Sequence, residues 1–175
     1  QIEIGGTYEY VSDKLREVVW YDSLTFYRID HERSMLVPVH ARGSYPDQVM
    51  SETFPVGEGI TGHVAKTGKA ELVNDPSLDA RATKVEGTPD EKEAIMSIPL
   101  RGREKIIGVM TIYREGSRTF TPADFEIVQL FANQAAVAVE NSELYMAEER
   151  LLRDSRTKVA QMSRVLELTT SVMYM

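Results

Sequence analysis

The long carboxyl-terminal run constrains this chain most, because from Pro122 to Met175 it contains no glycine and no further proline. A run of that length without turn residues predicts one continuous helix. Its start is well marked: Thr121 takes the N-cap position, Pro122 the first helical position, and Asp124 places a carboxylate in the first turn.

Two patterns follow each other along this predicted helix. Its first part repeats apolar residues at the spacing of a helix packed on a sheet, at Phe125, Val128, Phe131, Ala132, Ala135 and Val139. After Asn141 a heptad-like seam begins, made of Tyr145, Glu148, Leu152, Ser155, Val159, Met162, Leu166, Thr169 and Met173. We therefore expect a coiled-coil-type second part that forms a parallel homodimer through Tyr145, Leu152, Val159, Met162 and Leu166.

The region before this helix alternates short β-rich runs with turn residues, which predicts a sheet. The two most apolar runs, 95–100 and 105–113, should be its two central strands in an antiparallel sheet. Before these runs we expect a helix from Ser12 to about Trp20 capped by Ser12, and a hairpin of strands 24–30 and 35–41. A glycine loop at 55–62 should lead into a short helix from His63 that Gly68 ends. A strand at 72–73 and an irregular loop over 77–93 should follow.

Composition narrows the function classes. The chain has 175 residues and no cysteine, which removes disulfides, thiolate metal sites and thiol nucleophiles. A net charge of −7 and a pI near 5.1 argue against a nucleic-acid partner. No apolar run approaches a membrane span and no signal sequence opens the chain, so we expect a cytoplasmic protein without a membrane partner.

Five segments together resemble the GAF family of small-molecule sensory domains. They keep the family's order and spacing over about residues 12–145: DSLTFYRID at 22–30, VGEGITGHVAKTGK at 56–69, LVND at 72–75, IMSIPLRGREKIIGVMTIY at 95–113 and FTPADFEIVQLFANQAAVAVENSELY at 120–145. The resemblance implies an α+β fold with a six-stranded antiparallel sheet, helices on both sides, and a ligand pocket beneath the variable loop. We expect a sensory domain over 1–145 and a linker helix over 146–175 that leads to a further domain of a longer protein.

The resemblance also implies candidate ligand contacts. Positions that contact ligand in cyclic-nucleotide-binding members fall here on Thr25, His40, Ile60, Thr61, Thr88 and Thr111. Ser97 joins them because a hydroxyl on a central strand either contacts a ligand or bonds a neighbouring strand, an alternative that also applies to Thr111.

The motif of those members is incomplete here. Tyr113-Arg114 stands in place of Asn-Lys, and Asp124-Phe125 in place of Asp-Glu, although Arg114 can still pair with Asp124. This departure argues against a cyclic nucleotide as the ligand.

Other cofactors and an enzymatic function find little support. Bilin attachment and methionine-sulfoxide reduction in this family use cysteines, which the chain lacks. The histidines His31, His40 and His63 are not at chelating spacing, and none is placed as a haem ligand. No nucleophile motif or paired catalytic carboxylates stand out. The cofactor is left unknown and catalysis is not expected.

Three functions remain open at this point. The first is a ligand-sensing regulatory domain that passes pocket occupancy through its paired helix to an effector. The second is a degenerate domain whose pocket is filled by its own side chains and which only dimerises. The third is a long helix that docks a different protein. We favour the first.

Overall fold

The computed structural model describes residues 4–89 and 92–173. The chain divides into two compact units, the first ending at Val139 and the second beginning at Glu140.

The first unit contains a six-stranded antiparallel sheet with the strand order β3-β2-β1-β6-β5-β4. Its strands are β1 Ser23–Asp30, β2 Met35–Arg42, β3 Phe54–Pro55, β4 Glu71–Val73, β5 Glu93–Arg101 and β6 Ile106–Glu115. The expected fold class and the β1–β2 hairpin are confirmed. Of the two strands expected at the centre, β6 is there beside β1, whereas β5 lies one place further out.

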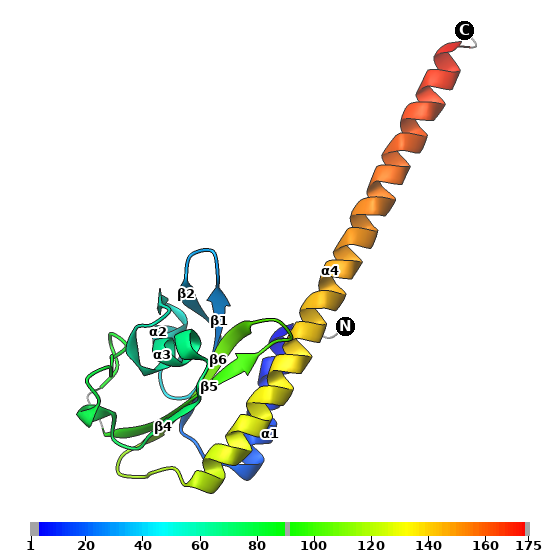
Figure 1. The fold of residues 1–175 in the computed structure, drawn as a ribbon. Helices are drawn as coiled ribbons and strands as arrows, with labels where there is room; N and C mark the ends of the chain where they lie inside the picture. The colour runs from blue at the N-terminus through cyan, green and yellow to red at the C-terminus, as the bar shows by residue number, and fades with distance from the viewer. Residues whose placement is uncertain (1–3, 90–91, 174–175) are drawn as a thin grey trace. The chain divides into compact units, whose positions relative to one another are not determined.

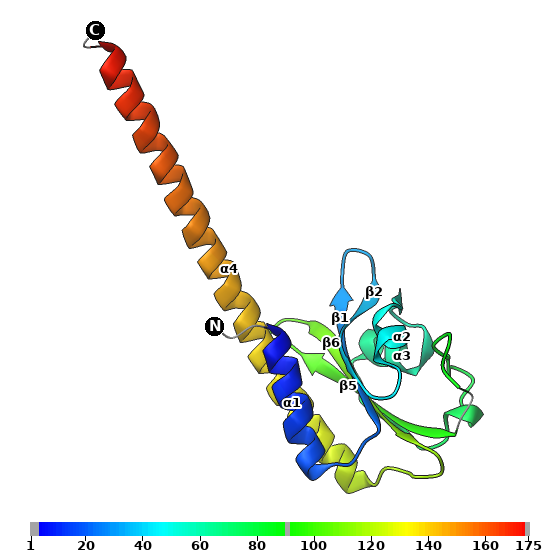
Figure 2. The ribbon, with the colours of Figure 1, turned by 180° about the vertical axis from the view of Figure 1, so that it is seen from behind.

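Helices lie on both faces of the sheet (Figures 1 and 2). One face carries α1, Ile4–Val18, beside the first part of α4, Pro122–Met173. The other face carries α2, Pro46–Met50, and α3, Gly59–Thr67. A single 3₁₀ turn, η1 at Pro76–Leu78, follows β4.

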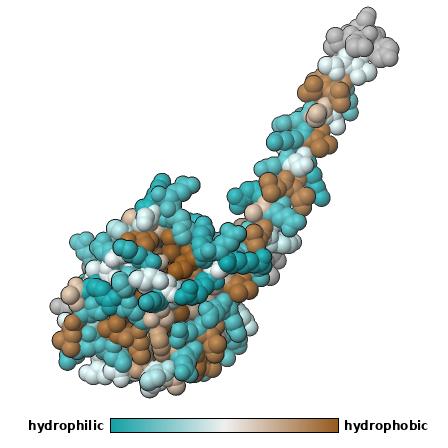
Figure 3. Space-filling view, viewed as in Figure 1, coloured by the Kyte–Doolittle hydropathy of each residue, from teal (hydrophilic) through white to brown (hydrophobic). Residues whose placement is uncertain are grey.

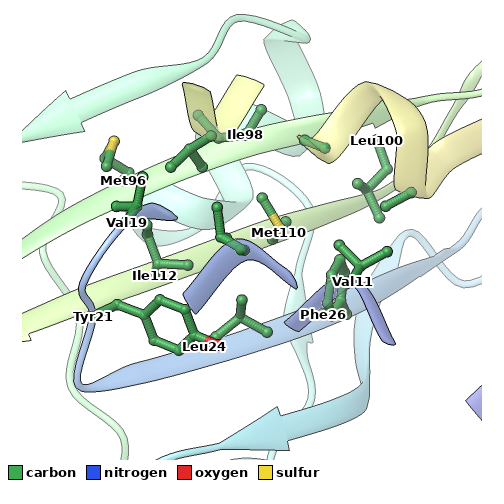
Figure 4. Packing of buried hydrophobic residues seen from close by; sticks show 14 of the residues in the cluster. Val11, Val19, Tyr21, Leu24, Phe26, Met96, Ile98, Leu100, Met110 and Ile112 are labelled. Atoms are coloured by element: carbon green, nitrogen blue, oxygen red, sulfur yellow. The ribbon is translucent and has the colours of Figure 1, made fainter. Parts of the chain in front are cut away.

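The α1–α4 face holds the main core because alternate residues of the strands point toward it. Figure 4 shows Leu24 and Phe26 from β1, and Met110 and Ile112 from β6, packed together with Val19. All five are at most 1% exposed. On the α4 side the core is completed by small or branched side chains that allow close packing, namely Val128, Ala132, Ala135, Ala136 and Val139.

Two local expectations need correction. Ser12 does not cap α1: the helix begins earlier, and the buried Ser12 hydroxyl donates a hydrogen bond to the Tyr8 carbonyl at 2.7 Å. Helix α3 begins at Gly59, before His63, although Gly68 ends it in the left-handed conformation as expected. The short elements α2 and β3 were not expected from the sequence.

The start of α4 agrees with its sequence signal. The Thr121 hydroxyl accepts a hydrogen bond from the Asp124 amide at 3.1 Å, and the Asp124 carboxylate accepts one from the Thr121 amide at 2.9 Å. Arg114 pairs with Asp124 at 3.2 Å, as expected, and its guanidinium lies 4.3 Å from the ring centre of Phe120. These contacts fix the entry of α4 at the end of β6.

The second unit is the remainder of α4. Figure 3 shows apolar and polar side chains recurring in turn along it. Among the described side chains, the proposed pairing residues are all more than half exposed: Tyr145, Leu152, Val159, Met162 and Leu166. The homodimer stays a prediction.

Candidate functional site

The candidate site lies on the sheet face that carries α2 and α3. Strand alternation and register build this face in cross-strand rows. One row is Ser23, Tyr113 and Ile95, and the next is Thr25, Thr111 and Ser97.

Helix α3 closes one half of this face. Its Thr61 hydroxyl lies 3.1 Å from that of Ser97 and 3.3 Å from that of Thr111, and the last two are 3.0 Å apart. Thr61 is 7% exposed and the other two are fully buried. The three hydroxyls, hereafter the hydroxyl triad, satisfy one another.

The other half of the face is open. It forms the floor of a cavity of about 500 Å³ that runs between β1, the end of β6, α2 and the segment after β4. The lining includes side chains from all of these elements: Ser23, Thr25 and Tyr27 of β1, Tyr113 and Glu115 of β6, Glu93 of β5, Tyr45, Pro46 and Val49 around α2, and Asp75, Lys84, Val85, Thr88 and Lys92 from the segment above.

A glycine makes one wall of the cavity possible. Gly43 has φ +143°, and a Cβ at this position would come within 2.4 Å of the Ser23 Cβ. The chain therefore passes directly over the start of β1 before it enters α2. This crossing brings Ser44 and Tyr45 to the cavity.

The segment above the cavity is anchored through Arg81. Its guanidinium donates to both Glu71 carboxylate oxygens, at 3.0 and 2.7 Å, and to Asp79. The Arg81 hydrogen bonds lower the pKa of the Asp79 carboxyl to about 2. These contacts hold the segment to β4 beside the cavity.

Two carboxylates meet at the edge of the cavity floor. Glu93 of β5 and Glu115 of β6 are direct cross-strand partners, and both are half-buried. Burial, and then the neighbouring charge of Glu115, raises the pKa of the Glu93 carboxyl.

Two tyrosines give the floor neutral hydroxyls. Burial raises the pKa of Tyr27 to about 12 and that of Tyr113 well above its usual value. Tyr27 and then Glu93 add to the effect on the Tyr113 pKa, and a hydrogen bond with Thr61 opposes it. Both phenols also have hydrogen-bond partners within the domain, Thr25 for Tyr27 and Thr61 for Tyr113.

The structure brings two of the expected contact residues to this cavity, Thr25 and Thr88. Ile60, Thr61, Ser97 and Thr111 lie instead beneath or within α3 and are not among its lining residues. The hydroxyls of Ser97 and Thr111 form hydrogen bonds with neighbouring elements, which is one of the two alternatives expected for them. Ligand contact by Thr25 and Thr88 stays a prediction.

His40 is placed on the other face of the sheet, near Tyr8 and Phe26. The reason is a β-bulge. Between Phe26 and Tyr27 the β1–β2 register shifts by one residue, so His40 pairs with Phe26 and Ala41 takes the place opposite Thr25. Burial there lowers the His40 pKa, and its buried Nε2 has no hydrogen-bond partner among the described residues.

Sequence reasoning missed Tyr27, Glu93, Tyr113 and Glu115 as cavity residues. A usable signal existed for three of them: in a regular strand, Tyr27 shares a face with Thr25, and Tyr113 and Glu115 share one with Thr111. No comparable sequence pattern predicted that α2 would line the cavity.

The sequence profile of the GAF domain family matches residues 3–140. The chain belongs to the GAF domain family. This GAF domain superimposes on the GAF domain/HD domain protein from Geobacter sulfurreducens with a TM-score of 0.72 and 17% identity, covering 81% of this chain and 95% of that one. At that identity the likeness shows the fold alone.

Two curated relatives are regulatory proteins. The GAF domain is 26% identical over 135 residues to the Nif-specific regulatory protein of Herbaspirillum seropedicae, covering 74% of this chain and 24% of that protein. It is 29% identical over 133 residues to the protein of the same name from Azospirillum lipoferum, covering 72% and 21%. The chain therefore spans less than a quarter of the length of these relatives.

Two further features bear on the site. In the described parts of the chain, no three His, Asp or Glu side chains are grouped so that they could hold a metal ion. No helix within residues 4–89 or 92–173 combines the length and apolarity needed to cross a membrane.

Proposed function

We propose that this GAF domain is the non-catalytic, small-molecule-binding regulatory part of a larger signal-transduction protein. The observation that carries the proposal is the cavity of about 500 Å³ on the α2–α3 face of the sheet. Its volume falls within the roughly 300–1,000 Å³ of small-molecule sites, and its lining combines aromatic rings with polar groups from several elements. The regulatory relatives support a signalling role.

The proposal includes an output through α4. The second unit of the chain exposes apolar side chains at heptad spacing, which is the pattern that two parallel helices bury between them. A ligand can shift such a pair between two arrangements only by the difference in its affinity for them. The seam includes Glu148, Ser155 and Thr169. Such an imperfect seam suits an exchangeable pairing better than a permanently closed one.

The binding claim is tested by thermal denaturation with a library of metabolite-like compounds. The Thr25→Phe variant should fill the cavity, so a compound that stabilises the wild type should no longer stabilise the variant. Thr119→Phe makes the same change at an exposed position and serves as the control. A compound that stabilises both variants equally would place its site elsewhere.

The pairing claim is tested by measuring mass in solution. We expect a wild-type dimer, and a monomer when Leu152 and Leu166 are both changed to Asp, because buried charges at the seam are costly. Leu168→Asp lies on the same helix outside the seam and should stay dimeric. A monomeric wild type, or a dimeric double variant, would contradict the pairing.

A second candidate function is dimerisation alone. The hydroxyl triad favours it, because two of the positions that match the family's ligand contacts, Thr61 and Thr111, are already hydrogen-bonded to each other and to Ser97 beneath α3. If no compound stabilises the wild type while the Leu152/Leu166 variant loses its dimer, this candidate replaces the first.

A further inference from the structure

We propose that His40 operates a pH-sensitive latch, which holds the amino-terminal half of α1 on the sheet while the imidazole is neutral and releases it when the imidazole gains a proton. His40 lies on the sheet face opposite the cavity, so the inference goes beyond the proposed function and needs no ligand there. Because α1 lies beside the first part of α4 (Figure 2), the latch lets pH act next to the helix proposed for output.

The first support is the position of the imidazole between two aromatic rings. Its centre lies 6.4 Å from that of Tyr8 in α1, with the two planes 19° apart, and 6.1 Å from that of Phe26 in β1. Among the described residues, its buried Nε2 has no hydrogen-bond partner. A neutral imidazole can keep this nitrogen as an unprotonated acceptor, whereas a protonated imidazole has an N–H donor at both ring nitrogens. Protonation without opening therefore buries a charged donor that has no acceptor, which is costly.

The charged groups around His40 do not supply a buried counter-ion. Burial, and then the like charge of Arg42 on the same strand, lowers the His40 pKa. From α1, Glu9 and Asp13 act in the opposite direction. Glu9 is exposed, however, and Asp13 already forms an ion pair with Arg42. The remaining neighbours, Tyr8 of α1 and the apolar ring from β1, present aromatic faces.

The amino-terminal half of α1 has little else to hold it. Gly5 and Gly6 stand in its first turn, and glycine is a poor helix former because it loses the most backbone freedom on folding. Within residues 5–11, the buried side chains are Tyr8 and Val11. This half of the helix therefore depends strongly on the residue that covers His40.

The carboxyl-terminal half of α1 has anchors of its own. The Tyr21 hydroxyl donates a hydrogen bond to the Ser12 carbonyl at 2.7 Å, and Asp13 is held by Arg42. Leu15 is completely buried in the main core. Opening at the first half can therefore stop near Ser12, which frees about two turns of helix and leaves the sheet intact.

The direction of the pH response follows from the two arrangements. In the closed arrangement the His40 pKa lies below its ordinary value of 6.5, and a ring that reaches water on opening returns toward that value. The closed arrangement is therefore fully favoured above pH 6.5 and loses stability as pH falls below it. Between pH 7.5 and pH 5.5 the open population should rise up to about tenfold through this group.

The test is hydrogen exchange of the backbone amides between pH 7.5 and pH 5.5, corrected for the intrinsic pH dependence of exchange. We expect the protection of residues 8–11 to fall up to about tenfold, while residues 13–18 and β6 keep theirs. Carboxyl groups of ordinary pKa stay ionised over this range, so the response reports on histidine. Protection of residues 8–11 that does not change with pH, or an equal loss throughout the domain, would overturn the inference.

Variants assign the response to one imidazole. His40→Phe keeps a ring in the same place and His40→Gln keeps a polar group, and neither side chain gains a proton. Protection of residues 8–11 should no longer fall with pH in either variant, even if His40→Gln starts from a lower level. His31→Phe makes the matched change at an exposed position and should keep the wild-type response. An unchanged response in both His40 variants would contradict the assignment.

The titration of the His40 ring, followed by NMR, gives an independent check. We expect its pKa to lie below 6.5 in the wild type. Titration above pH 6.5 would show that the charged imidazole finds a counter-ion, such as Glu9, while α1 stays in place. That result would overturn the latch.

Discussion

Two neighbouring parts of one sheet face are covered differently in this domain. Thr25 and Thr111 are direct cross-strand partners on β1 and β6. Thr111 is fully buried beneath α3 within the hydroxyl triad, whereas Thr25, although only 3% exposed, lines the cavity. The strands are the same, so the difference comes from what covers them. A helix that brings its own hydroxyl closes the face, and a cover made of a short helix and an irregular segment leaves room for a ligand.

The largest expected difference in unfolding free energy is between Thr→Phe at Thr111, beneath α3, and Thr→Phe at Thr25, beside the cavity. Thr111→Phe must force a ring into a fully buried site and break two hydroxyl contacts, which should cost at least roughly 3 kcal/mol of unfolding free energy. Thr25 is also buried, at 3% exposed, but it borders the cavity, so Thr25→Phe should cost less, about 1 kcal/mol. Chemical denaturation of both variants measures the contrast. Equal losses would mean that the two halves are equally closed.

The next effect tests how far bulk water reaches the open half. Tyr27 has a pKa of about 12 in the folded chain and about 10 when unfolded, so its contribution is present below pH 10 and is lost as pH rises through 12. Stability should fall by roughly 2–3 kcal/mol over this range because of this group. Tyr27→Phe should reduce the fall. An ordinary phenol titration near pH 10 in the folded protein would show that water solvates the floor fully.

A smaller effect separates the hydroxyl triad from ordinary packing. Thr111→Val keeps the shape but leaves Thr61 and Ser97 each short of one partner, which should cost about 1–2 kcal/mol. The triple variant Thr61→Val, Ser97→Ala and Thr111→Val removes all three hydroxyls of the triad. It should cost less unfolding free energy than Thr111→Val alone. Thermal and denaturant midpoints measure both. A triple variant that loses the sum of three single losses would contradict mutual satisfaction.

Much of the fold could be predicted from the sequence because the strongest signals are local. The apolar runs of β5 and β6, the hairpin turn and the Thr121–Asp124 cap each depend on residues close together in the chain. The early start of α1 was missed because Ser12, a good capping residue, instead bonds back to the preceding turn.

The site was harder to predict because it depends on which elements pack over the sheet face and on the register of the strands. The family resemblance assigned Thr111 to the correct face but could not tell that α3 covers it. One extra residue in β2 moves His40 to the opposite face, and no sequence feature marks that bulge. Tyr113 and Glu115 were within reach of alternation alone, whereas the cavity wall formed by Tyr45 required the tertiary crossing at Gly43.

Native mass spectrometry of gently purified protein tests the central claim most directly, since the claim is that the open half of the face is a ligand site. The account predicts a discrete extra mass on the wild-type chain that is absent from Thr25→Phe, with both chains folded. The same extra mass on both chains would contradict it.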